Sequence, residues 1–185
     1  MSNTASQNST ASKKTLLLMV AVFVVPVILA KLALENDWFT KAATNKGQLL
    51  SPTIDMTSVL NQVDPKWRLV YVLPSQCDAV CENALFSINQ VWLALGKESD
   101  RAEALVLTHE TSDKNALSAL SDYPNVVTLE SKALSGLEDN TVYIVDTQNN
   151  AMLFYQINRD RKEAVMESRD MLADMRKLLK LSRIG

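Results

Sequence analysis

The chain has 185 residues, with 19 Lys and Arg against 21 Asp and Glu, and a formal net charge of −2. This length suits one main domain, and the nearly balanced charge argues against a nucleic-acid partner. The 4 Gly and 5 Pro are too few for a turn-dense all-β protein or a disordered chain. A single histidine, His109, excludes a site with several histidines from one chain.

An apolar run occupies residues 15–34, which is about the length that a helix needs to cross the hydrocarbon core of a bilayer. Such a helix tolerates Pro26, and the side chain of Lys31 can reach the interface. A cleaved signal peptide is the alternative, but residues 28–30 form a poor cleavage site. The sequence therefore predicts a single transmembrane anchor, preceded by a tail of residues 1–14.

The charges on either side of the span predict its orientation. Lys13 and Lys14 precede it with no acidic residue nearby, whereas Glu35 and Asp37 follow it. Because positive residues favour the cytoplasmic side, we expect a cytoplasmic N-terminus and an inner (plasma) membrane location. The remainder of the chain would then face the periplasm. Two cysteines can form and keep a disulfide in that oxidising compartment.

Beyond the span, turn residues in 35–64 indicate a linker and a lead-in segment, and residues 65–185 carry regular apolar patterns. We expect strands at 67–73, 104–108, 126–129, 141–145 and 152–155, and helices at 80–95, 112–120 and 160–181. Ser112 is the expected N-cap of the second of these helices. Strands that alternate with helices and end in a hairpin predict an α/β, thioredoxin-like fold.

The only two cysteines, Cys77 and Cys81, lie between the first predicted strand and the first predicted helix. A strand, a short loop and two thiols at a helix start is how thioredoxin-like folds present reactive sulfur. The thiols can pair with each other, with a metal or with another molecule. An inert structural disulfide, or two unreactive thiols, is the alternative to a redox pair. In a redox pair we expect Cys77 to be the exposed, attacking sulfur and Cys81 the resolving one.

With these features the chain resembles the Sco/SenC family of membrane-tethered, thioredoxin-like proteins that assemble cytochrome c oxidase. The resemblance covers the anchor, the strand 67–73, the CxxxC spacing of Cys77 and Cys81, the strand leading to His109, and the hairpin around 142–146. It implies an accessory task in oxidase biogenesis, with oxidase subunits or other assembly factors as partners. It also implies a copper(I) site formed by both cysteines and a histidine before the hairpin; soft thiolates select Cu(I).

Three positions depart from the family pattern. Glu138 stands where the family has its distal histidine, and a carboxylate is a hard, poor ligand for Cu(I). Asp78 and Glu82 follow the two cysteines, where the family usually has prolines, and their charges oppose thiolate formation. These departures favour thiol exchange over copper delivery.

His109 is the candidate for a substitute copper ligand. If its strand lies parallel to and beside 67–73, both strands end at one edge of the sheet, where ligands bind in open α/β folds. A solvated loop histidine is the alternative. A copper(I) chaperone using Cys77, Cys81 and His109, and a non-catalytic assembly scaffold, therefore remain as alternatives to a thiol exchanger.

Two further groups of residues have simpler interpretations. The methionines of the last predicted helix have helical spacing, which indicates core packing more than copper ligation; they are Met166, Met171 and Met175. The charged residues around the start of that helix are predicted to form a solvated face; they are Arg159, Asp160, Arg161, Lys162, Glu163 and Glu167.

Overall fold

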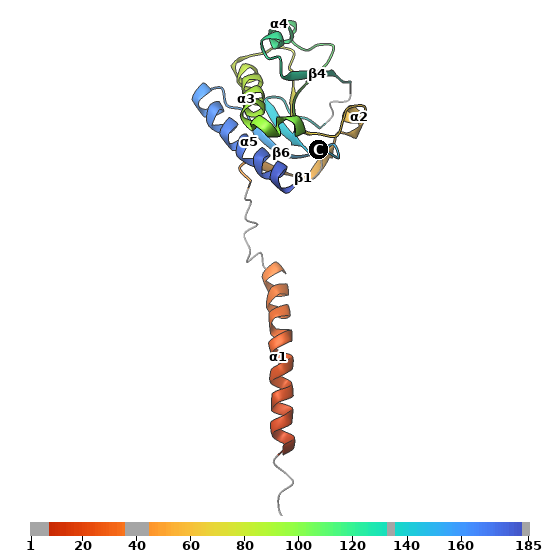
Figure 1. The fold of residues 1–185 in the computed structure, drawn as a ribbon, viewed down its shortest axis with the longest axis vertical. Helices are drawn as coiled ribbons and strands as arrows, with labels where there is room; N and C mark the ends of the chain where they lie inside the picture. Colours follow the sequence, from red (N-terminus) through yellow and green to blue (C-terminus); the bar gives the residue numbers. More distant parts are fainter. Residues whose placement is uncertain (1–7, 36–44, 133–135, 183–185) are drawn as a thin grey trace, which may run out of the picture. The chain divides into compact units, whose positions relative to one another are not determined.

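The computed structural model describes residues 8–35, 45–132 and 136–182. The chain divides into two compact units, Met1–Thr44 and Asn45–Gly185. The first unit contains the helix α1, and the second contains the α/β domain (Figure 1). Part of the predicted tail, residues 1–7, and part of the predicted linker, residues 36–44, lie outside the described residues.

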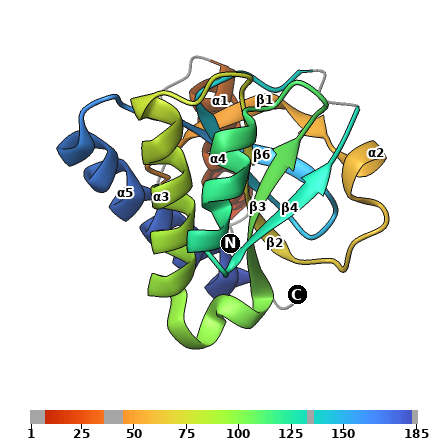
Figure 2. The same cartoon turned by 90° about the horizontal axis from the view of Figure 1, so that it is seen from above.

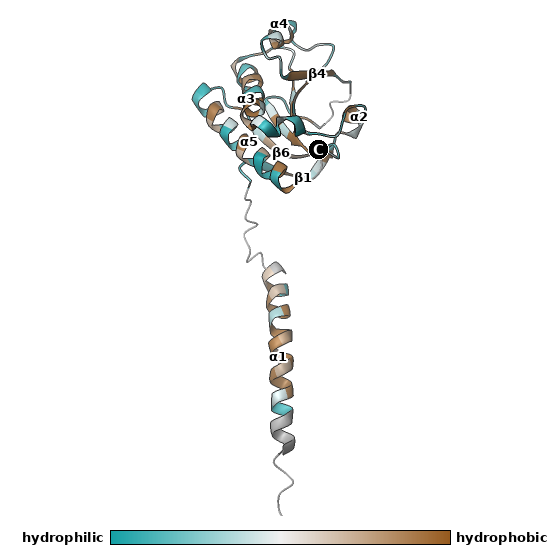
Figure 3. Ribbon diagram, viewed as in Figure 1, coloured by the Kyte–Doolittle hydropathy of each residue, from teal (hydrophilic) through white to brown (hydrophobic). Residues whose placement is uncertain are grey.

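The helix α1 covers Asn8–Glu35, so it begins within the predicted tail rather than at Thr15. Its segment Lys13–Ala33 has a mean hydropathy of 2.7 and is, among the described helices, the one long and apolar enough to cross a membrane. Brown, hydrophobic residues dominate this segment in Figure 3. Side chains such as Leu17 and Phe23 are largely exposed. Such a helix is a membrane anchor or a signal sequence.

The second unit has the following elements in chain order: β1 Gln48–Asp55, α2 Thr57–Leu60, β2 Trp67–Val72, α3 Ala79–Leu95, η1 Gly96–Arg101, β3 Ala102–Thr108, α4 Lys114–Ala119, η2 Leu120–Asp122, β4 Val126–Glu130, β5 Thr141–Val145, β6 Asn150–Gln156 and α5 Arg161–Leu181. From β2 to α5 this is the predicted order of strands and helices, which confirms the α/β, thioredoxin-like fold. Within the lead-in segment, β1 and the short helix α2 were not predicted.

The strands of the described residues form one sheet in the order β1-β6-β5-β2-β3-β4. The pairs β2–β3 and β3–β4 are parallel, whereas β5 and β6 return antiparallel and form the closing hairpin. Trp67 lies opposite Ala102, and Val72 lies opposite Leu107, so β2 and β3 end at the same edge of the sheet. The condition that the sequence analysis set for His109, a strand parallel to and beside β2, is therefore met.

Apolar residues cover both faces of the sheet. The larger core lies between the sheet and the helices α3, α4 and α5, and it includes Tyr71 and Cys81 (Figure 2). The smaller core, on the other face, is built around Val70, Tyr143 and the residues Met56 and Leu60 at α2. The alternation along β2 explains this division, because successive side chains of a strand point to opposite faces. The disulfide described next lies at the edge of the larger core.

Candidate functional site

Cys77 and Cys81 form a disulfide with a Cα–Cα distance of 5.2 Å. Cys77 lies in the loop before α3, and Cys81 lies in the first turn of that helix. Cys81 is fully buried, whereas Cys77 is partly buried and packs against the larger core. Of the pairings that the sequence left open, the structure therefore has the two cysteines joined to each other. Their exposure follows the predicted order, with Cys77 the more accessible sulfur.

Asp78 caps the helix that begins between the two cysteines. Its carboxylate accepts hydrogen bonds from the N–H groups of Val80 at 3.0 Å and Cys81 at 3.3 Å, as an N-cap residue does. The Arg159 guanidinium lies 2.5 Å from the same carboxylate. The N–H of Cys81, followed by the contacts with Val80 and Arg159, holds the pKa of Asp78 below its usual range, although burial opposes this. A negative charge is thus fixed beside the disulfide, as the sequence predicted, and a positive charge offsets it.

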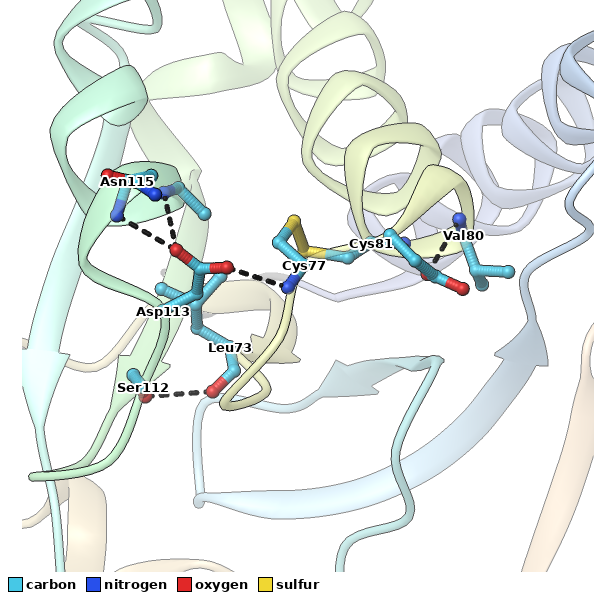
Figure 4. The surroundings of a disulfide bond; sticks show 9 residues. Leu73, Cys77, Val80, Cys81, Ser112, Asp113 and Asn115 are labelled. Carbon is cyan, nitrogen blue, oxygen red and sulfur yellow. Dashed lines mark hydrogen bonds between the residues drawn. A yellow bond between two sulfur atoms is a disulfide. The ribbon is translucent and has the colours of Figure 1, made fainter.

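A second carboxylate, that of Asp113, supports the loop that carries Cys77. Its Oδ2 accepts the backbone N–H of Cys77 at 2.9 Å, while its Oδ1 accepts the N–H groups of Asn115 and Ala116 (Figure 4). Asp113 is therefore the N-cap of α4, one residue after the predicted cap. These three hydrogen bonds, chiefly that from Cys77, lower the pKa of Asp113. One charged side chain connects the two loops at this edge of the sheet.

Ser112, which the sequence predicted to cap α4, has another task. Its hydroxyl donates to the carbonyl of Leu73 at 2.8 Å and accepts the N–H of His109 at 3.0 Å. It thereby ties the end of β2 to the loop after β3. Ser and Asp are both strong capping residues, so the pair Ser112-Asp113 gave no local reason to choose between them.

His109 follows β3 at the same edge as the cysteines but belongs to a different surface hollow. Its Nδ1 lies 2.8 Å from the Thr111 hydroxyl. The hollow is lined by residues from the loop after β3 and the end of β4: His109, Glu110, Thr111, Glu130, Ser131 and Lys132. Neither cysteine lines it. The proposed role of His109 as a copper ligand stays a prediction.

The donor set in the described residues does not fit the copper site that the resemblance implies. No group of three or more His, Cys, Asp or Glu side chains in this part of the chain could hold a metal ion. The two sulfurs are joined in a disulfide, so neither is a thiolate ligand in this state. Glu138 precedes β5 and its backbone N–H donates to the Tyr143 hydroxyl at 2.7 Å; its carboxylate remains a poor match for Cu(I).

The loop between β6 and α5 contributes residues that the sequence did not identify as part of the site. The buried amide of Asn83 on α3 donates to the carbonyls of Asn158 and Arg159. Arg161 donates to the Oδ1 of Asn83 at 2.8 Å and lies over the ring of Phe86 at 3.5 Å. These contacts hold Arg159 beside Asp78. Arg159 and Arg161 are exposed, as predicted, but both also contact residues at the start of α3, which the sequence did not predict.

Two other expectations for α5 have different outcomes. Met171 and Met175 are fully buried in the larger core, as their helical spacing predicts. Met166 is 53% exposed, and its sulfur lies 3.5 Å from the Nη1 of Arg169, so it is not a core residue. Ala164 and Ser168, on either side of Met166, are buried, so this turn packs on the domain and Met166 lies off the buried face of α5.

The fold and the family model together define the class of this protein. The chain belongs to the family described as transmembrane-like, thioredoxin-like, C-terminal domain, whose model matches residues 67–182. The matched segment begins with β2 and contains the cysteine pair and the elements through α5. A comparison with curated proteins finds no match.

Several solved structures are similar to the chain. Apo Sco1 from Thermus thermophilus is 16% identical with a TM-score of 0.51, covering 72% of this chain and 96% of that one. Copper-bound ScoI from Bradyrhizobium japonicum is 18% identical with a TM-score of 0.41, covering 59% and 87%. A secreted disulfide oxidoreductase from Mycobacterium tuberculosis, homologous to E. coli DsbE, is 13% identical with a TM-score of 0.44, covering 61% and 85%. The Sco1 similarity is one of fold.

Proposed function

We propose that this protein is a membrane-tethered thiol–disulfide exchange protein that acts through Cys77 and Cys81. The observation that carries the proposal is the disulfide at the start of α3, with one partly exposed and one buried sulfur. An attacking thiolate can reach the first sulfur from solvent, while the second is protected from other reagents. This asymmetry is suited to exchange, since the rate depends on which sulfur is accessible.

The exchange proceeds in two displacements. A thiolate of a partner dithiol attacks the Sγ of Cys77, the Cys77–Cys81 bond breaks, and its electron pair leaves on the Sγ of Cys81. The partner's second thiolate then attacks the partner sulfur of the mixed disulfide and releases Cys77 as a thiolate. The partner becomes a disulfide, and this chain gains two electrons and, with them, two protons from solvent. In the reverse direction Cys77 attacks and Cys81 resolves.

The location and context are part of the proposal. With α1 as an uncleaved anchor over residues 15–34, the basic Lys13 and Lys14 favour a cytoplasmic N-terminus. The thioredoxin-like domain, residues 65–185, would then lie in the periplasm at the inner membrane. The sequence resemblance to Sco/SenC proteins supports an accessory task in cytochrome c oxidase biogenesis, with oxidase subunits or assembly factors as the dithiol partners.

The proposal is tested on the full chain in detergent. The Cys81→Ser variant should accumulate a mixed disulfide between Cys77 and a dithiol partner, because the resolving thiol is missing. The Cys77→Ser variant should accumulate none and should lose exchange. Retained exchange in Cys77→Ser would contradict the assignment. In cells, normal oxidase assembly with both cysteines replaced would instead favour the assembly scaffold.

A further inference from the structure

A buried tyrosine of the core cluster that contains the cysteines has no role in the fold that its hydrogen bonding explains. Tyr71 is fully buried, and its hydroxyl has no hydrogen-bond partner among the described residues. A buried hydroxyl without a partner destabilises the fold relative to a satisfied one. Phenylalanine would fill the same volume without this cost. The oxidised structure therefore does not explain why this position has a tyrosine hydroxyl.

Tyr71 shares the larger core with the cysteines. It lies near the end of β2, and its side chain is on the sheet face that packs against α3, in the same core cluster as Cys77 and Cys81. The charges that act on its hydroxyl are those of Asp78, the cap between the two cysteines, and Asp139, just before β5. Trp67, whose buried indole N–H also lacks a partner among the described residues, is at the opposite end of the strand.

Opening the disulfide creates a need for a hydrogen-bond donor. When the bond breaks, negative charge develops on the Sγ of Cys81, which is fully buried in the oxidised state. A buried charge is costly unless donors stabilise it. Three backbone N–H groups at the helix start are already in use: those of Val80 and Cys81 donate to the Asp78 carboxylate, and that of Glu82 donates to the Asp78 carbonyl. The N–H of Cys77 donates to Asp113.

We infer that the Tyr71 hydroxyl donates a hydrogen bond to the Sγ of Cys81 when the disulfide is reduced. The inference rests on the proposed exchange function and deepens it. Tyr71 then stabilises the leaving thiolate, and it favours the reduced form over the oxidised form, in which the hydroxyl has no partner. Burial, followed by the charges of Asp78 and Asp139, raises the pKa of Tyr71 well above its usual range. The phenol therefore stays protonated and acts as a donor, not as an anion.

The Tyr71→Phe variant of the full chain in detergent tests the inference. The fraction of reduced protein is measured by thiol alkylation in mixtures of reduced and oxidised dithiothreitol at one pH. Loss of the hydrogen bond should lower the equilibrium constant for reduction about tenfold, which corresponds to about 30 mV. The oxidised form should unfold at the same denaturant concentration as the wild type or at a higher one, because only an unpartnered hydroxyl is removed.

The matched control is Tyr143→Phe, which removes a buried hydroxyl on the opposite face of the sheet. That hydroxyl accepts the N–H of Glu138, so its loss should lower stability but leave the reduction equilibrium within twofold of the wild type. A reduction equilibrium within twofold of the wild type in Tyr71→Phe would overturn the inference. A wild-type disulfide that dithiothreitol does not reduce in the folded protein would overturn the proposed function as well.

A second measurement does not depend on the stability of the Tyr71→Phe variant. Infrared difference spectra between the oxidised and reduced wild-type protein should show a shift of a tyrosine C–O stretching band. The Tyr143→Phe variant should retain this shift, because the hydroxyl that it lacks belongs to a tyrosine of the other core. Spectra without a tyrosine band that changes on reduction would contradict a new hydrogen bond at Tyr71.

Discussion

The carboxylate of Asp113 accepts the backbone N–H of Cys77 at 2.9 Å, across 36 residues of sequence. The backbone of the cysteine with the more accessible sulfur is therefore bonded to the residue that also caps α4. The position of the Cys77 loop thus depends on α4 as well as on α3. Because Ser112 joins the same two loops through the Leu73 carbonyl, the cysteine loop and the start of α4 form one hydrogen-bonded unit. A change at α4 is thus expected to alter the reactivity of Cys77.

The Asp113→Asn variant should separate the two tasks of this carboxylate. The amide oxygen can still accept the N–H groups of Asn115 and Ala116, since Asn is as good a cap as Asp. Its NH₂ group then faces the N–H of Cys77, a donor against a donor, so that link is lost. We expect nearly unchanged helical content and a change of roughly threefold or more in the rate of exchange with a dithiol. The same rate in the variant and the wild type would show that the link does not affect Cys77.

The low pKa values of Asp78 and Asp113 predict acid sensitivity. The ordinary pKa of each carboxyl group is 3.8, and hydrogen bonds in the folded state lower both values. Their stabilisation is therefore complete above that value and is lost as the pH falls through it toward the folded pKa. Denaturant midpoints should begin to drop as the pH falls to about 4 and should continue to drop below it. A double Asp78→Asn, Asp113→Asn variant should show a flatter profile; an equally steep one would count against this account.

Glu167 acts in the opposite sense and is the control for that experiment. Burial raises the pKa of Glu167, so its contribution to stability falls as the pH rises through its titration. The Glu167→Gln variant should therefore keep the acid-induced loss of stability that the two aspartates cause. If the stability of this variant did not change with pH in the acid range, Asp78 and Asp113 would not be the cause of the acid-induced loss.

Asp174 is the buried centre of a third group of contacts, at the entry to the α/β domain. Its Oδ2 accepts the Tyr155 hydroxyl at 2.6 Å and the N–H groups of Lys46 at 2.7 Å and Gly47 at 2.9 Å. The Asp174→Ala variant leaves these donors without their acceptor and should cost about 3 kcal/mol of unfolding free energy. The same change at the partly exposed Asp170, one turn earlier, should cost under about 0.5 kcal/mol. Chemical denaturation of both variants measures the difference.

A substitution at Gly47 tests the contact between Tyr155 and Asp174 by displacing the tyrosine ring. A Cβ at this position would lie 2.5 Å from the Cζ of Tyr155, so the ring would have to move away from Asp174. Gly47→Ala should therefore destabilise the domain by about 1–3 kcal/mol, the range for overpacked sites. Combined with Tyr155→Ala, the glycine change should cost much less. Additive losses in the double variant would show that the Tyr155 ring is not the obstacle.

The sequence predicted the elements from β2 to α5 because their apolar patterns have clear periods. It did not predict β1, whose side chains are mostly exposed and which contains Pro52 at the edge of the sheet. Edge strands need no alternation of buried and exposed residues, so they carry no strong pattern. The four-residue helix α2 is too short to show a helical period.

The cysteine pair was predicted from its spacing, but its supporting residues were not. Asp113 is 36 residues from Cys77, and Arg159 is 81 residues from Asp78. Such contacts depend on which strand ends meet at one edge, and a single sequence does not reveal them. Tyr71 was predicted within a strand, yet its hydroxyl has significance only because no residue in the described part of the chain forms a hydrogen bond with it.

The charges of Asp78 and Arg159 should shift the reduction equilibrium of the disulfide in opposite directions. The Arg159→Gln variant leaves the Asp78 charge uncompensated beside the cysteines, so it should disfavour the thiolate and lower the equilibrium constant for reduction. The Asp78→Asn variant keeps a capping residue but removes the charge, and it should raise that constant. Both side chains are substantially exposed, so changes of roughly two- to fivefold are expected. Shifts in the same direction in both variants would contradict an electrostatic cause.

Copper(I) titration decides between exchange and copper delivery. The reduced full chain in detergent is titrated with Cu(I) against a competing chelator, with the Cys77→Ser, Cys81→Ser double variant as control. We expect no tight binding that depends on the cysteines, because no group of three or more His, Cys, Asp or Glu side chains among the described residues could hold a metal ion and Glu138 offers a hard ligand. One copper bound tightly per chain, and lost in the control, would instead support the chaperone. His109→Ala would then show whether the loop after β3 moves to the thiolates and supplies the third ligand.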